Sequence, residues 1–151
     1  MFEKRFVAGW GEMDFNSHMR NTAFLDKSAD VRMMFFAENG FPMDEFIRRK
    51  IGPVIQKDNL EYFKEVRLLE EMRVTLAIAG LAEDGSRFLM RNEFWRADER
   101  LAATVTSSGG WLDLALRNLV LPPEGLLSAL CLLPRTADFQ TIPSNIKSGC
   151  G

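Results

Sequence analysis

The residues best suited to chemistry lie between positions 14 and 22. Asp14 supplies a carboxylate, and His18 is the only histidine of the chain. Asn21 and Thr22 stand where a long stretch without proline or glycine begins, which predicts the start of a helix. The first turn of a helix carries unpaired backbone N–H groups and a positive dipole end, which together can hold a negative oxygen. A carboxylate beside such an oxyanion site is an arrangement that hydrolases use.

A strand before this loop and a helix after it must position these groups. The run over residues 2–10 has a strand-like pattern, and residues 22–38 carry apolar side chains such as Leu25 and Ala29 at helical spacing. Because the apolar stripe is wide, the helix should be buried on most sides. Residues 14–21 are therefore predicted to form a loop that leads into the helix.

The remainder of the chain predicts an antiparallel sheet. Gly109-Gly110 inside the last long strand predicts a bulge or a close approach of another backbone. A helix followed by such strands is an α+β layout in which a long antiparallel sheet can wrap around one central helix. The predicted elements are a short helix over 43–49, one long or bulged strand from Gly52 to Tyr62, strands over 72–79 and 88–94 with a turn at Asp84-Gly85, a third strand that begins at Leu101 and contains Gly109-Gly110, and a helix opened by Pro122-Pro123.

Length and composition limit the class of protein. The 151 residues, 46% of them hydrophobic, fit one domain over residues 1–135 and a C-terminal tail over 136–151. A net charge of −2 gives no electrostatic case for nucleic acid, and no apolar run is long enough to span a membrane. We therefore expect a cytoplasmic protein without nucleic-acid or membrane partners. Cys131 and Cys150 lack the spacing of a metal site, so no metal or other cofactor is expected.

The motif around Asp14 resembles a known family. Trp10–Leu25 is similar to the opening motif of hotdog-fold acyl-CoA thioesterases of the 4-hydroxybenzoyl-CoA thioesterase family, in which an aspartate precedes a Gly-His-Val-Asn-Asn-like turn into the central helix. The similarity extends over about residues 3–133, through Gly52-Pro53-Val54, Glu61-Tyr62 and Gly110–Leu114. The resemblance implies a hotdog fold, a homodimer or homotetramer whose sheets join, and active sites between subunits. The independent layout of elements agrees with that fold.

The resemblance also implies roles for individual residues. Asp14 matches the family's catalytic carboxylate, and Asn21 matches the helix-start position whose backbone N–H polarises the thioester carbonyl. His18 matches the histidine of the turn and is expected to support the site. In this chain Ser17 replaces the usual glycine and Arg20 replaces the first asparagine. One branch of the family uses a Tyr, Asp and His trio, but here Trp10 and Asn21 stand at its Tyr and His positions.

Thioester hydrolysis needs few groups, because a thiol leaves easily as a thiolate. A thiol of pKa about 8.5 departs near neutral pH with little help from an acid. Asp14 could attack the thioester directly or act as a general base on water, and the sequence leaves both routes open. The expected substrate is an acyl-CoA, and the sequence leaves open an acyl-carrier thioester instead. Trp10, Phe15 and Tyr62 are predicted to contact it or to form the core beside it, and Arg87 is a candidate for the coenzyme A phosphates or, more simply, a surface charge.

Simpler interpretations accompany each assignment. Asp14 followed by Phe-Asn-Ser could form only an Asx turn, and a single histidine is more often a loop-fixing hydrogen-bonding group. Asp30 on the predicted helix is a competing carboxylate, because another branch of hotdog thioesterases places its catalytic acid on the central helix. The alternative function is a non-catalytic acyl-binding hotdog protein. A hydratase of the same fold fits less well, because it would need a basic histidine near an acid across the site and only His18 is available.

Overall fold

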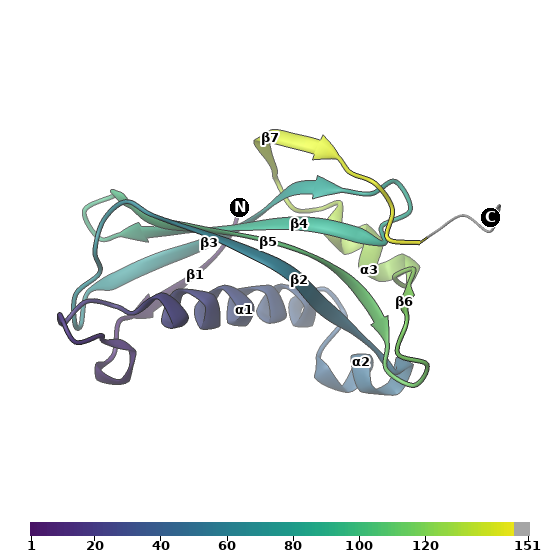
Figure 1. Ribbon diagram of the computed structural model, residues 1–151, viewed down its shortest axis with the longest axis horizontal. Helices are drawn as coiled ribbons and strands as arrows, with labels where there is room; N and C mark the ends of the chain where they lie inside the picture. The colour runs from purple at the N-terminus through teal and green to yellow at the C-terminus, as the bar shows by residue number, and fades with distance from the viewer. Residues whose placement is uncertain (147–151) are drawn as a thin grey trace.

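The structure is a computed structural model that describes residues 1–146, and one curved sheet dominates it (Figure 1). The strand order is β1-β3-β4-β5-β2, with β6 beside β5 and β7 beside β3. All pairings are antiparallel except that of β7 with β3. The elements are β1 (Phe2–Val7), a 3-10 turn η1 (Trp10–Glu12), α1 (Asn21–Glu38), α2 (Met43–Arg49), β2 (Ile51–Tyr62), β3 (Glu71–Leu81), β4 (Arg87–Arg96), β5 (Leu101–Asp113), β6 (Leu119–Val120), α3 (Glu124–Leu130) and β7 (Arg135–Thr141).

Helix α1 runs along one face of the sheet, which curves around it (Figure 1). Val74 and Leu76 alternate with more polar residues along β3 and are fully buried, as are Val31 and nearly all of Phe35 on α1. Burying each of these side chains contributes about 1.5–3 kcal/mol, so the helix and the sheet stabilise each other. This is the α+β hotdog fold, and the prediction of a long antiparallel sheet wrapped around one central helix is confirmed.

Strand β2 lies at an edge of the sheet and contains a bulge, and the sequence predicts one long or bulged strand here. It pairs along its length with β5, and the register shifts between Ile55 and Lys57. The paired strand approaches so closely at Gly109 that a Cβ atom there would overlap the carbonyl oxygen of Val54. The backbone of β2 therefore leaves no room for a side chain at position 109, which explains why this residue is a glycine.

The C-terminal segment differs from the predicted tail. Residues 135–141 form β7, which pairs in parallel with the end of β3. Two parallel hydrogen bonds of 2.8 and 3.0 Å from the Arg91 guanidinium to the Asp138 carboxylate fasten β7 to β4. This segment joins the sheet because β1 pairs only with residues 71–76 of β3 and leaves the edge of residues 78–81 unpaired. The weak apolar alternation of residues 135–141 does not predict this pairing. The last part of the predicted tail, residues 147–151 with Cys150, lies outside the described residues.

Within residues 1–146, no helix is both long and apolar enough to cross a membrane. The cytoplasmic location stays a prediction.

Candidate functional site

The loop that carries Asp14 is a tight hairpin-like turn. The Asp14 N–H donates to the His18 carbonyl oxygen at 2.6 Å, and the Ser17 N–H donates to the Asp14 carbonyl oxygen at 3.1 Å. Met13 and Met19 face each other as a bridge at its base. Ser17 adopts φ = 61°, in the left-handed region. This conformation explains why glycine would suit position 17, since only glycine adopts it without steric strain.

Replacing Ser17 by glycine is expected to raise the free energy of unfolding by about 0.5–1 kcal/mol, because relief of the left-handed strain outweighs the greater freedom of glycine in the unfolded chain. Denaturant titration followed by circular dichroism measures the change. Ser17→Ala is the matched control and is expected to give no gain. A lower stability of the glycine variant would contradict this explanation of the turn.

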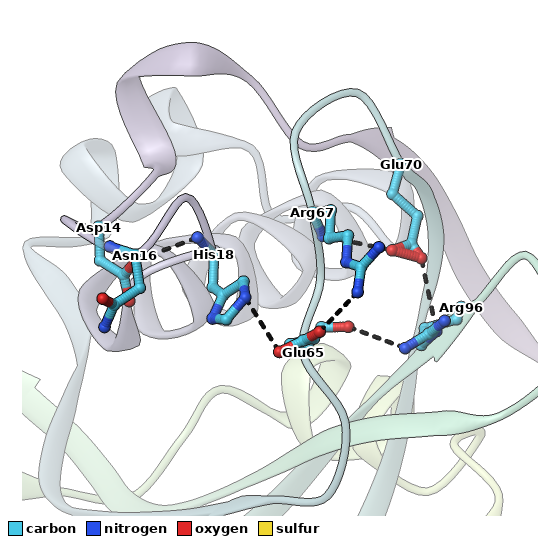
Figure 2. A network of polar contacts seen from close by, with 7 residues as sticks. All are labelled: Asp14, Asn16, His18, Glu65, Arg67, Glu70 and Arg96. Atoms are coloured by element: carbon cyan, nitrogen blue, oxygen red, sulfur yellow. Dashed lines mark hydrogen bonds and ion pairs between the residues drawn. The ribbon is translucent and has the colours of Figure 1, made fainter.

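The Asp14 side chain is exposed and is held by its own loop. Its Oδ1 accepts hydrogen bonds from the backbone N–H groups of Asn16 at 2.8 Å and His18 at 3.0 Å. Figure 2 shows the carboxylate beside Asn16, with the backbone of His18 directed at it. Among the described residues, no donor contacts Oδ2. The loop thus fixes the carboxylate through one oxygen and leaves the other available, so the Asx turn and a chemical role are compatible.

His18 is joined to a second loop, which follows β2. Its Nε2 lies 3.0 Å from Glu65 Oε2, and its backbone forms a bridge with Arg67. Arg67 also donates to Glu65 at 3.0 Å, and Arg96 donates to the Glu65 carbonyl oxygen at 3.0 Å (Figure 2). The hydrogen bond from Arg67 and then the charge of His18 lower the pKa of Glu65. An ionised Glu65 therefore holds His18, which supports a positioning role for the histidine.

The start of α1 leaves one backbone donor free. Arg20 is the N-cap in extended conformation, at φ = −75° and ψ = 157°, so the helix begins at Asn21. The Asn21 side chain accepts from the Thr22 N–H at 2.9 Å, and the Ala23 N–H donates to the Arg20 carbonyl oxygen at 3.0 Å. In residues 1–146 the Asn21 N–H has no acceptor. The helix begins one residue before the predicted span of residues 22–38, and the unpaired N–H belongs to Asn21.

Glu12 fastens the same region to the helix. Its carboxylate accepts from the Gly9 N–H at 2.8 Å and lies 2.6 Å from the Lys27 Nζ on α1. Burial alone would raise the pKa of Glu12, but the contacts with Lys27 and Gly9 outweigh burial and lower the pKa. The Glu12 carboxylate therefore stays ionised and fixes the entry of the chain into α1.

The two loops and the helix start enclose a cleft of about 450 Å³. Four predicted site residues line it together: Asp14, His18, Asn21 and Tyr62. The remaining lining residues, which sequence reasoning did not assign to the site, are Met19, Arg20, Phe24, Phe63, Lys64, Glu65 and Val66. The cleft therefore combines a carboxylate, an unpaired helix N–H, an aromatic wall and the cations Arg20 and Lys64.

Three predicted substrate contacts and the competing acid lie outside this cleft. Trp10 is 79% exposed in the 3-10 turn and Phe15 is fully exposed at the tip of the loop, so neither belongs to the core. Arg87 pairs with Gly110 of β5, and this position lies seven residues along β5 from the residue that pairs with Tyr62. Seven residues of a strand extend about 23 Å, so Arg87 lies far from the cleft. Asp30 lies on the exposed face of α1.

The fold places the chain among the hotdog proteins, and comparisons with known proteins agree with this class. Residues 8–130 match the family model described as the thioesterase-like superfamily. The chain belongs to the thioesterase-like superfamily. Curated proteins yield no match.

Solved structures share the fold at low sequence identity. A hypothetical protein from Staphylococcus aureus in complex with CoA is 20% identical, with a TM-score of 0.80 over 86% of this chain and 81% of that chain. A 1,4-dihydroxy-2-naphthoyl-CoA thioesterase from Synechocystis is 16% identical, with a TM-score of 0.77 over 87% and 96% of the two chains. A gentisyl-coenzyme A thioesterase is 18% identical, with a TM-score of 0.75 over 85% and 98%.

Proposed function

We propose that this protein hydrolyses acyl-CoA thioesters to a carboxylic acid and free coenzyme A. The observation that carries the proposal is that the Asp14 carboxylate and the unpaired Asn21 N–H line one cleft. Membership in the thioesterase-like superfamily and the CoA complex of a structural neighbour support it.

In the proposed reaction, the thioester carbonyl oxygen accepts a hydrogen bond from the Asn21 N–H at the positive end of the α1 dipole. Negative charge that develops on this oxygen is stabilised there. The free oxygen of Asp14 either attacks the carbonyl carbon or takes a proton from the water that attacks it. The carbon–sulfur bond then breaks and coenzyme A leaves as a thiolate. In the first route, water hydrolyses the resulting anhydride and restores the Asp14 carboxylate.

The test is a survey of acyl-CoA hydrolysis with a reagent that reports free thiols, across short, long and aromatic acyl groups. We expect turnover of at least one class at a rate well above spontaneous hydrolysis. The competing possibility is an acyl-binding protein without turnover, which the two hydrogen bonds to Asp14 Oδ1 favour because they give that carboxylate a structural role. Binding of acyl-CoA by calorimetry without thiol release would establish that alternative.

We also propose that the protein assembles as a homodimer through the free edge of β2. Within the described residues β2 pairs only with β5, so alternate residues of this twelve-residue strand present unpaired backbone groups on the other side. Unpaired edges favour pairing with another strand. Tyr62, the last residue of β2, and Phe63 after it are exposed aromatic residues that a partner would cover. Light scattering should give twice the chain mass of 17.2 kDa or a multiple of it, and a monomer would contradict the proposal.

A further inference from the structure

An arginine lies buried between α1 and the sheet, outside the cleft described above. Arg32 is only 8% exposed, and within residues 1–146 no carboxylate oxygen lies within ion-pair distance of it. Its Nη1 donates two long hydrogen bonds, to Ser107 Oγ at 3.2 Å and to Asn92 Oδ1 at 3.4 Å. A guanidinium carries five N–H donors, so this side chain keeps most of its donors unused.

Other polar groups surround it. Ser107 Oγ donates in turn to Asp58 Oδ1 at 2.5 Å, and Asp58 is an exposed residue of the edge strand β2, so these contacts link α1 to β2 through β5. Ser28, one helical turn before Arg32, is completely buried, and its hydroxyl has no partner among the described residues. Burial lowers the pKa of Arg32 and the charge of Asp58 opposes that effect. We call Arg32, Asn92, Ser107 and Asp58 the polar cluster.

The buried charge of Arg32 is unfavourable as a purely structural device, because the exposed Asp58 compensates it only through a longer-range charge interaction. Burying a charge without a direct ionic partner costs free energy, and apolar residues of similar volume often stabilise a protein more than a buried charged pair does. Buried ionisable groups that lack full pairing are therefore candidates for ligand recognition.

The polar cluster lies in line with the cleft. Phe24 of α1 lines the cleft and contacts Tyr62 of β2, with ring centres 5.7 Å apart. From Phe24 to Arg32 the helix rises about 12 Å, and from Tyr62 to Asp58 the strand extends about 13 Å. The two elements thus run together from the aromatic pair to the polar cluster. Leu60 of β2 lies between them and is half-buried.

The helix side of this path is also apolar and incompletely covered. Leu25 and Ala29 precede Arg32 by seven and three positions, which puts all three on one stripe of α1, and both are half-buried. An acyl chain that enters from the cleft could lie along this strip. At about 1.2 Å per bond, a chain of about eight to ten carbons spans the distance to the polar cluster.

We propose that the polar cluster selects acyl groups that carry a neutral hydrogen-bonding group, such as a hydroxyl, at their far end. The inference rests on the proposed thioesterase function and names its substrate class. Arg32 and Asp58 together carry no net charge, so a hydroxyl finds both a donor and an acceptor. A terminal carboxylate would bring a second negative charge close to Asp58, and a terminal methyl group would leave the Arg32 donors unused.

The experiment compares three CoA thioesters of equal chain length that differ only at the far end. These are decanoyl-CoA, 10-hydroxydecanoyl-CoA and decanedioyl-CoA, with the eight-carbon set as a repeat. For the wild-type protein we expect kcat/KM for the hydroxyl substrate to exceed those for the other two by about tenfold, the size of one hydrogen bond to a charged group. Equal values, or a preference for the methyl end, would overturn the proposal.

Two variants separate recognition from a structural role. Arg32→Met should reduce the ratio of hydroxyl to methyl substrate to about one, while its melting temperature stays equal or rises, because the buried charge is removed. Asp58→Asn leaves Arg32 uncompensated and should shift the preference to decanedioyl-CoA. Arg100→Met, at an exposed turn, is the matched control and should leave the ratio unchanged. An unchanged ratio in Arg32→Met would overturn the proposal, whatever its stability.

Failure of this inference is distinguishable from failure of the proposed function. If the wild type releases thiol from acyl-CoA substrates but its kcat/KM does not depend on the group at their far end, only the inference about the polar cluster is wrong. If no acyl-CoA of any class is hydrolysed, the thioesterase function itself is wrong.

Discussion

Replacement of Asp14 by asparagine is expected to reduce kcat for acyl-CoA hydrolysis by about 10²- to 10⁴-fold. Asparagine keeps the shape of the side chain and an Oδ1 atom that can accept the hydrogen bonds from the Asn16 and His18 N–H groups. The loop should therefore persist, while the negative charge that attacks carbon or accepts a proton is lost. Steady-state kinetics with the thiol reporter measure the effect, and thermal melting should show a nearly unchanged protein.

The matched control for this experiment is Asp30→Asn. Asp30 is an exposed carboxylate of α1 outside the cleft, so its loss should change kcat less than about threefold. The opposite pattern, with Asp14→Asn active and Asp30→Asn inactive, would transfer the catalytic role to the central helix.

The backbone donor at Asn21 can be removed without removing the helix. Proline has no N–H and is favoured at the first helical position, and Arg20 before it already has the extended conformation that a following proline requires. Asn21→Pro is therefore expected to fold normally and to lose about 10²- to 10³-fold in kcat, the effect of losing one oxyanion donor. Steady-state kinetics measure the loss, and circular dichroism checks the helix content.

Asn21→Ala is the partner of that variant, because alanine lacks the amide side chain but keeps the backbone N–H. We expect its kcat to stay within a few fold of the wild-type value, although the hydrogen bond from the Thr22 N–H to the Asn21 side chain is lost. If alanine and proline impair the reaction equally, the side chain of Asn21 and not its N–H is the important group. If neither impairs it, the oxyanion site lies elsewhere.

The sequence predicts the parts of this fold that repeat a strong pattern. Helix α1 and strands β3 to β5 can be predicted from the spacing of their apolar residues. Each element buries one face against the others, so its apolar residues repeat with the period of a helix or of a strand. The bulge in β2 follows from a polar segment inside an apolar run, and the close approach at Gly109 follows from the glycine pair. The sequence does not predict strand β7, because only scattered residues of it are half-buried and its partner is the end of a distant strand rather than a hairpin neighbour.

The candidate site was predictable where it is local in sequence. Asp14, His18 and Asn21 lie within eight positions, so a turn and a helix start bring them together. Lys64 and Glu65 come from a distant loop that joins the site through the bridge of His18 to Arg67 and through the contact of the His18 ring with Glu65. No periodic pattern in the sequence predicts such contacts. Trp10 was placed at a strand end by its apolar character, but the chain turns into a 3-10 turn there and leaves the ring exposed.

The polar cluster shows a different limit of sequence reasoning. Arg32 falls among the polar positions of α1, which suggest an exposed face, yet its side chain is buried against β4 and β5. The register of β2 and β5, which places Ser107 opposite Asp58, shows that the sheet presents polar groups to the helix at this point.

The most direct test of the account is a crystal structure of the protein with a non-hydrolysable acyl-CoA analogue that replaces the thioester sulfur by a methylene group. We expect the analogue's carbonyl oxygen to lie about 2.7–3.1 Å from the Asn21 nitrogen. We also expect the carbonyl carbon to lie about 3–3.5 Å from an Asp14 oxygen, or from a water that Asp14 holds, which would separate the nucleophile from the general base. An analogue bound with its carbonyl away from both groups would contradict the account.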